Sequence, residues 1–278
     1  MRAAAVQLNS TEDRGSNLAR AERLVRAASA DGARLVLLPE RFDLRGSDVT
    51  YARGAAPLDG EVAAWAATLA RELSIDLVAG STTERRDGHE KVSNTSLHFG
   101  PAGDLQALYR KIHLFDVTVG DVNFRESDSG ESGDEIVVSH ASDGTPLGLS
   151  ICYDLRFPEL YRILALEGAL VLLVPANFTR PTGQAHWEVL LRARAIENQA
   201  FVVAAGQVGT SPPEQGPAYG SSMIVDPWGE VLARASDDGE EVVVADLDLD
   251  RLRQVRERLP SLANRAADAY RWPLEAHA

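Results

Sequence analysis

The stretch RAAAVQLNSTEDRGSNLARAERLVRAASADGARLVLL, residues 2–38, decides the fold class. Both of its ends, 2–8 and 34–38, are short apolar runs of the kind that form strands, and the second is almost continuously apolar, as in a buried parallel strand. Residues 17–30 between them have apolar side chains at helical spacing, and Gly32 is a stop signal. The inner face of this helix carries Leu18, Ala21, Leu24, Val25 and Ala28. The stretch therefore predicts a strand–helix–strand unit.

The rest of the chain continues the alternation of strands and helices. We expect helices over 61–73, 158–168, 185–198 and 248–258, and strands over 75–80, 92–99, 104–110, 135–139, 146–151, 169–174, 200–206, 221–226, 230–235 and 241–246. Residues 112–134 show no period, and we expect them to form a loop, which at that length is often functional. The alternation favours an α/β fold with helices covering the sheets, and the hairpins favour mixed sheets.

No repeat, low-complexity tract or linker interrupts this pattern, so we expect a single domain over residues 1–278. The tail, residues 259–278, has no strong period, and we expect it to reach across to a partner subunit. The formal net charge of −13 would repel a phosphate backbone. No apolar run approaches the ~20 residues of a membrane-spanning helix. The single cysteine, Cys152, excludes an intrachain disulfide and fits a reducing, cytoplasmic environment. Neither nucleic acid nor a membrane is therefore an expected partner.

Three polar residues at the ends of predicted strands could carry chemistry. Cys152 follows the apolar run LGLSI and precedes a helix, whose N-terminus would stabilise the nucleophilic thiolate. Glu40 follows the buried strand 34–38, where partial desolvation would raise its pKa toward the range of a general base. Lys111 closes another strand, and its ammonium could stabilise a developing oxyanion.

Each of these residues also has an ordinary interpretation. A lone cysteine is usually a small buried hydrophobe, and glutamate and lysine usually lie on the surface. Their shared position, at the carboxyl ends of strands in separate units, favours a common site instead. A nucleophile, a base and an oxyanion stabiliser are the groups that amide hydrolysis by a thiol needs.

Three motifs that contain these residues resemble a known family. LLPERF, YRKIHLFD and LSICYDLRFPEL are similar to the Glu, Lys and Cys motifs of the nitrilase superfamily of carbon–nitrogen hydrolases, and the likeness runs through essentially the whole chain. The segment CYDLRFPE looks like the small-amide branch, which contains omega-amidases and deaminated glutathione amidases. Nitrile-cleaving members usually carry Cys-Trp-Glu at that point, which this chain lacks.

The resemblance implies a fold and a catalytic set. The fold is a four-layer α-β-β-α sandwich, and members commonly pair into homodimers of eight layers. Cys152 matches the nucleophile, Glu40 the general base and Lys111 the oxyanion-binding lysine, with the backbone N–H of Tyr153 completing the oxyanion hole. Glu126 is the best match to a second glutamate near the lysine. Glu131 and Glu135 are poorer matches.

The resemblance also implies hydrolysis of a small ω-amide through a cysteine thioester, without metal or cofactor. Deaminated glutathione or a keto-acid ω-amide is the expected substrate. Arg156 or Arg180 could bind its carboxylate, although Arg156 could equally form a structural salt bridge with Glu159 or Asp154. Asn177 and Phe178 follow a strand end, and we expect them to line the pocket.

Several alternatives stay open at this point. Another amide, a carbamoyl compound or a nitrile could be the substrate within the same superfamily. A Cys–His hydrolase would use His113 or His186 with the cysteine. A metal site could include His113 and Asp116, but no further ligand stands at a suitable spacing. A catalytically idle relative kept for binding is disfavoured, because all three catalytic positions are intact.

Overall fold

The computed structural model describes residues 1–210, 212–213 and 216–270, and it contains the predicted strand–helix–strand unit. β1 (Arg2–Gln7) and β2 (Leu35–Leu37) pair in parallel, and α1 (Arg14–Ala30) connects them. α1 begins earlier than its apolar spacing predicted, because the Asp13 carboxylate caps it by accepting a hydrogen bond from the Ser16 N–H. Gly32, at φ 87°, follows the helix end as expected.

The larger of two mixed sheets holds this unit. Its strands follow the order β18 (Glu241–Asp246), β1, β2, β3 (Asp76–Val78) and β5 (Val92–Phe99). β3 and β4 (Thr82–Glu84) lie along one edge of β5, and β6 (Leu105–Arg110) and β9 (Gly130–Glu131) lie along the other. All of β5 is buried, so it does not alternate between core and solvent as a simple hairpin strand would.

The smaller sheet comes from the second half of the chain. Its order is β10 (Val138–His140), β11 (Pro146–Leu149), β12 (Val171–Ala176), β13 (Phe201–Gly206), β16 (Met223–Val225) and β17 (Val231–Arg234). The three central strands β11, β12 and β13 run parallel, and the outer pairs are antiparallel.

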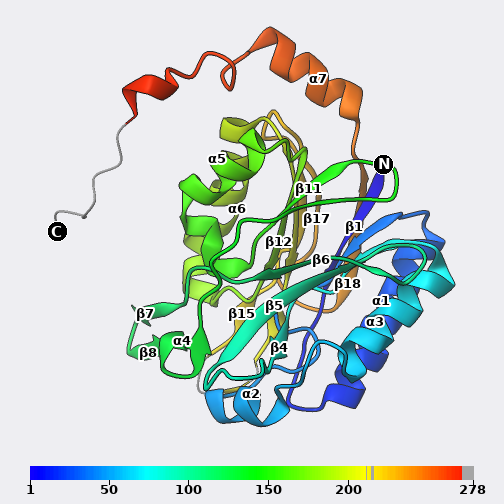
Figure 1. Ribbon diagram of the computed structural model, residues 1–278, viewed down its shortest axis with the longest axis vertical. Helices are drawn as coiled ribbons and strands as arrows, with labels where there is room; N and C mark the ends of the chain where they lie inside the picture. Colours follow the sequence, from blue (N-terminus) through cyan, green and yellow to red (C-terminus); the bar gives the residue numbers. More distant parts are fainter. Residues whose placement is uncertain (211, 214–215, 271–278) are drawn as a thin grey trace.

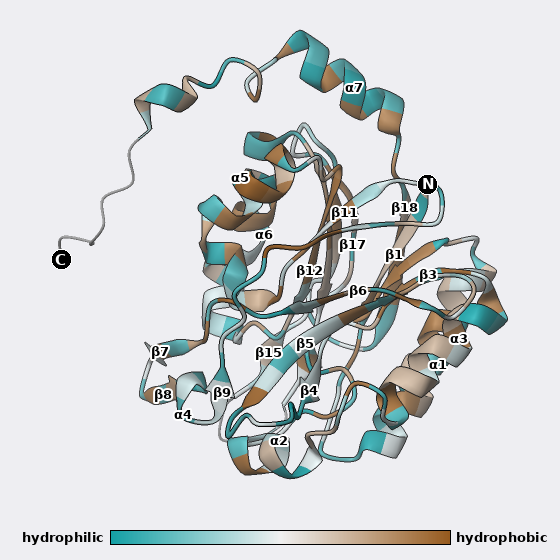
Figure 2. Ribbon diagram, in the orientation of Figure 1, coloured by the Kyte–Doolittle hydropathy of each residue, from teal (hydrophilic) through white to brown (hydrophobic). Residues whose placement is uncertain are grey.

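The four-layer α-β-β-α sandwich is confirmed. α1 and α3 (Glu61–Leu73) cover the larger sheet, while α5 (Pro158–Leu166) and α6 (Arg180–Asn198) cover the smaller one (Figure 1). The two sheets pack face to face, with β1 against β13. Figure 2 shows the strands as the apolar centre of this arrangement, with more hydrophilic helical surfaces outside.

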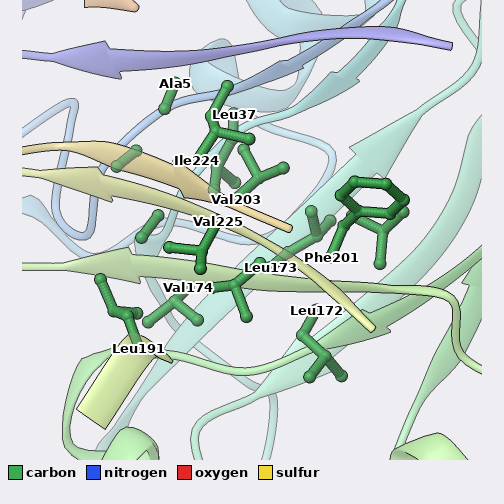
Figure 3. Packing of buried hydrophobic residues seen from close by; sticks show 14 of the residues in the cluster. Ala5, Leu37, Leu172, Leu173, Val174, Leu191, Phe201, Val203, Ile224 and Val225 are labelled. Carbon is green, nitrogen blue, oxygen red and sulfur yellow. The ribbon is translucent and has the colours of Figure 1, made fainter. Parts of the chain in front are cut away.

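Alternate residues of β1 and β2 serve two different cores. Ala5 and Leu37 point between the sheets, where they belong to one cluster with Val203 and Ile224 (Figure 3). The intervening residues of both strands pack in a second cluster with side chains of α1 and α3. A strand that is buried on both faces must be apolar at every position, which explains the continuous apolar runs in the sequence.

The predicted loop over 112–134 is wrong. This segment forms the hairpin β7 (Asp116–Val119) and β8 (Val122–Arg125), followed by α4 (Glu126–Ser129) and β9. The hairpin strands are only four residues long, pair with each other in a sheet of their own and turn at Gly120 (φ 58°). Their apolar residues alternate with polar ones, but over too short a run to stand out from the surrounding polar segment. Four further short elements were also missed for want of a pattern: α2 (Asp48–Gly54), β4, β14 (Val208–Gly209) and β15 (Ala218–Tyr219).

The chain leaves the sandwich after α7 (Leu249–Arg258). Residues 259–270 are mostly exposed, and Figure 1 shows them running away from the other elements. The last part of the predicted tail, residues 271–278, lies outside the described residues. Among the helices that the structure describes, none combines the length and the apolar character that crossing a bilayer would require.

Candidate active site

The two sheets deliver the three sequence-predicted residues to one cavity of about 520 Å³. Glu40 follows β2 and Lys111 follows β6 in the larger sheet, while Cys152 follows β11 in the smaller one. Lys111 Nζ lies 3.3 Å from Glu40 Oε1, and Cys152 lines the same cavity as both. The cavity opens at the end of the sandwich where α2, α4 and the β7–β8 hairpin lie (Figure 1).

Cys152 stands on a strained turn. It begins the 3-10 helix Cys152–Arg156 with a left-handed backbone, at φ 50°. Such a conformation costs a non-glycine residue roughly 1–2 kcal/mol, so the surroundings must hold it in place. Burial, followed by the negative charge of Glu40, raises the pKa of the thiol well above its usual value. The resting thiol is therefore protonated and needs a base to become a nucleophile.

The Asp154 carboxylate fixes this turn and joins it to the lysine segment. It is fully buried and accepts hydrogen bonds from Ile151 N–H (2.8 Å) and Tyr109 O–H (2.7 Å). It also contacts His113 Nδ1 at 2.7 Å and accepts a hydrogen bond from the His113 N–H. Because His113 lies two residues beyond Lys111, this one carboxylate sets the position of the lysine relative to the cysteine.

Lys111 lies between two carboxylates. Its Nζ donates to Glu126 Oε2 at 2.7 Å and to Glu40 Oε1 at 3.3 Å. Burial would lower the pKa of Lys111, but the charges of Glu126 and Glu40 outweigh it and raise the pKa above its ordinary value. Burial likewise opposes ionisation of Glu126, yet Lys111 and then Arg41 hold its pKa below the ordinary value. The ammonium and the Glu126 carboxylate are therefore both charged at neutral pH.

Two further residues belong to this cluster, and the sequence interpretation missed both. The Arg41 guanidinium lies 3.8 Å from Glu126 Oε1, donates to the Thr83 hydroxyl and stacks on the Tyr51 ring at 4.2 Å. Asn94, on β5, donates to Glu40 Oε1 at 2.9 Å and to Glu126 Oε1 at 3.4 Å. Arg41 could have been predicted as a site residue, because it directly follows Glu40 in the chain. The signal for Asn94 was weaker, because it lies in a run of polar residues within a buried strand.

The predicted substrate contacts divide into two groups. Tyr153, Arg156, Asn177 and Phe178 all line the cavity. The Asn177 backbone slightly offsets the rise in the pKa of the Cys152 thiol. Arg180 is not among the lining residues and pairs with Asp238 at 3.5 Å, so the expectation that it meets the substrate is not supported.

Arg156 faces the cavity without an acidic partner. Its guanidinium stacks on the Phe178 ring at 5.3 Å and the Tyr153 ring at 6.0 Å, and its Nη1 lies 3.2 Å from His186 Nδ1. Within the described part of the chain it forms no ion pair, and neither Asp154 nor Glu159 pairs with it. Aromatic stacking holds the cation in place while its hydrogen-bonding edge remains available for an anion.

The alternative candidates have other partners. The His113 ring stacks on Phe157 at 3.6 Å and is bound to Asp154, and it is not among the cavity-lining residues. Glu131 pairs with Arg86 at 2.7 Å and with His89, away from Lys111. Within residues 1–210, 212–213 and 216–270, no group of three or more His, Cys, Asp or Glu side chains is arranged to hold a metal ion.

Comparison with known proteins gives consistent matches over the whole fold. The sequence model described as "Carbon-nitrogen hydrolase" matches residues 2–257. Deaminated glutathione amidase from Synechocystis sp. is 42% identical over 268 residues, which cover 95% of this chain and 97% of that protein. Omega-amidase NIT2 from Mus musculus is 40% identical over 273 residues, which cover 97% of this chain and 96% of that protein.

A solved structure of a similar amidase shows a covalent reaction at its active site cysteine. It is a mutant of the amidase from Nesterenkonia sp. AN1, showing covalent addition of the acetamide moiety of fluoroacetamide at the active site cysteine. This structure aligns with a TM-score of 0.78 and 26% sequence identity, covering 96% of this chain and 94% of that one.

Proposed function

We propose that this chain, which belongs to the carbon–nitrogen hydrolase family and is an amidase of non-peptide carbon–nitrogen bonds, hydrolyses small ω-amides that carry a carboxylate. Deaminated glutathione is the first candidate substrate, and a keto-acid ω-amide is the second. The observation that carries this proposal is the meeting of Cys152, Glu40 and Lys111 in one cavity whose wall also holds Arg156.

In the acylation half-reaction, Glu40 takes the proton of the Cys152 thiol, and the sulfur forms a bond to the amide carbon. The carbonyl π electrons move to oxygen, and Lys111 with the Tyr153 backbone N–H stabilises that oxyanion. Glu40 then gives its proton to the amide nitrogen, the carbon–nitrogen bond breaks and ammonia leaves. The product on the enzyme is a thioester.

In the deacylation half-reaction, Glu40 takes a proton from water, and the oxygen attacks the thioester carbon. The carbon–sulfur bond then breaks, the sulfur recovers the proton, and the carboxylic acid leaves. The charges suit this sequence. Before the reaction, the formal charges of this cluster sum to zero: two carboxylates, Glu40 and Glu126, balance two cations, Lys111 and Arg41. When Glu40 takes the proton, a net positive charge remains beside the oxyanion.

The first prediction concerns the far end of the substrate. The change is Arg156→Met, which keeps the apolar stem of the side chain and removes the cation. Loss of a charge-assisted contact should raise KM for deaminated glutathione or α-ketoglutaramate by roughly 10–100-fold. The KM of an uncharged amide such as butyramide should change less than about twofold. Ammonia release by wild type and variant measures both.

The same assay tests the proposed function as a whole, with glutamine and simple nitriles added to the panel. Ammonia release from a carboxylate-bearing ω-amide is the expected result. No release from any amide would favour a relative kept for binding, and preferential release from nitriles would place the chain in another branch. An equal effect of Arg156→Met on charged and uncharged amides would remove Arg156 from substrate recognition.

We further propose that these single-domain subunits, residues 1–278, pair as homodimers in the cytoplasm, the compartment that suits a thiol-dependent site. Large apolar side chains are exposed on the outer helical layer. Val189 (68% exposed) and Ile196 (46%) lie seven residues apart on one face of α6, and Leu166 (48%) lies on α5. Trp228 (58%) lies on the turn whose Gly229 is beside Ile196. The tail, residues 259–278, would then extend to the partner.

The second prediction tests this pairing. Val189→Glu places a charge in the centre of the proposed interface, and it should shift the molecular mass in solution from twice the 30.0 kDa chain toward a single chain. Light scattering after size exclusion measures the mass. Leu105→Glu is the matched control, because Leu105 is 46% exposed on β6 of the other sheet and should leave the mass unchanged. A single-chain mass for the wild type would contradict the dimer.

A further inference from the structure

Asn94 connects the polar groups of the site. Its side-chain Nδ2 donates to Glu40 Oε1 at 2.9 Å and to Glu126 Oε1 at 3.4 Å, and its backbone carbonyl accepts from the Lys111 N–H at 2.9 Å. We infer that Asn94 is a positioning residue that holds the Glu40 carboxylate in place beside the Cys152 thiol. This inference rests on the proposed function, because it assigns Asn94 its effect through the proposed base.

The orientation of the amide follows from its neighbours. An ionised carboxylate only accepts hydrogen bonds, so the NH₂ end must face Glu40 and Glu126, and the opposite orientation would set the amide oxygen against both. The amide oxygen of Asn94 lacks a hydrogen bond among the described residues. Asn94 itself is 3% exposed. A buried amide that leaves one polar atom unpaired is costly for stability, so its value lies in the two bonds that Nδ2 makes.

A neutral donor suits this position better than a cation. Lys111 pairs with Glu40, and the charge of Glu40 also acts on Arg45, Tyr51 and Cys152. Arg41 and Glu126 pair with each other in the same cluster. Glu126 also faces Asp48 of α2. A further cation beside a carboxylate favours its charged form and weakens it as a base. The Asn94 amide instead stabilises the ionised carboxylate by hydrogen bonding and leaves the charge balance unchanged.

This arrangement has a measurable consequence for pH dependence. Hydrogen bonds to the charged form of a carboxylate favour that form, so their removal moves its protonation to higher pH. Glu40 and Glu126 share donors, so the acid limb of kcat/KM reports the pair rather than either residue alone. Asn94→Leu should therefore shift this acid limb upward by about one pH unit. A purely structural role would lower kcat/KM equally at every pH.

The third prediction uses two readouts on the full chain. The first is the pH profile of ammonia release, and the second is the pH profile of Cys152 alkylation by iodoacetamide, which needs no substrate. Cys152 is the chain's one cysteine, so the alkylation signal is unambiguous. Both acid limbs should move upward together in Asn94→Leu. Asn94→Asp, which replaces the donors with a third carboxylate, should move them further and serves as the second variant if Asn94→Leu does not fold.

Thr95→Val is the matched control. Thr95 follows Asn94 on β5, is fully buried and donates to a different carboxylate, Glu84 Oε2, at 2.7 Å. Its replacement should lower stability without moving either acid limb. Unchanged limbs in both Asn94 variants would overturn the inference. If wild type released no ammonia from any amide, the proposed function would fail, and the alkylation profile alone would still decide the role of Asn94.

Discussion

Replacing Cys152 with Ala should abolish amide hydrolysis, with a fall in kcat/KM of about 10⁵-fold or more. The size of this effect follows from the role of the thiol in both half-reactions, because removal of a catalytic nucleophile leaves only the binding and oxyanion groups. The chain has no other cysteine that could substitute. Ammonia release at substrate concentrations well below KM measures the loss.

The loss should be chemical rather than structural. Alanine removes one buried sulfur atom and keeps the left-handed backbone, so the free energy of unfolding should change by only about 1 kcal/mol. Thermal unfolding of both proteins checks this. Mass spectrometry of the intact chain under turnover should show an acyl adduct on wild type and none on the variant. A variant that kept more than about 1% of wild-type activity would remove Cys152 from the mechanism.

The sequence predicted the framework of the fold and two of the three main site residues for the same reason. A buried strand must be apolar at every position, so β2, β12 and β13 are visible as apolar runs, and the polar residue that ends such a run is conspicuous. Glu40 and Cys152 were found in this way. That the two sheets stack came from the family resemblance, because strand patterns do not reveal which faces meet.

The elements and residues that the sequence did not predict lack such a long apolar run. The β7–β8 hairpin and α2 help to form the cavity wall, and each element has only four to seven residues, too few for a clear period. Asn94 and Arg41 act through contacts with residues distant in the chain, and only the folded structure brings those contacts together. Arg180 was weighed with Arg156 only as a cation that could bind a carboxylate, and the sequence did not indicate that the start of α6 places it beside Asp238.

Glu40→Gln should lower kcat by about 10³–10⁴-fold and leave KM nearly unchanged. A single general base typically contributes 10²–10⁴-fold, and Glu40 moves protons to or from the thiol, the leaving nitrogen and the attacking water, which places it at the upper end. Glutamine has nearly the same shape and can still contact Lys111 and Asn94, but it cannot take a proton. Because the thiol pKa is raised, loss of the base should also slow the reaction of Cys152 with the amide.

Two companion variants make this result specific. Glu131→Gln is the matched control, because Glu131 pairs with Arg86 and His89 away from the cavity and should keep wild-type kcat. His113→Gln tests the Cys–His alternative. Since His113 acts only by holding Asp154, its loss should lower kcat by no more than about tenfold. Near-normal turnover in Glu40→Gln, with turnover abolished in His113→Gln, would instead assign the base to the histidine and require a different mechanism.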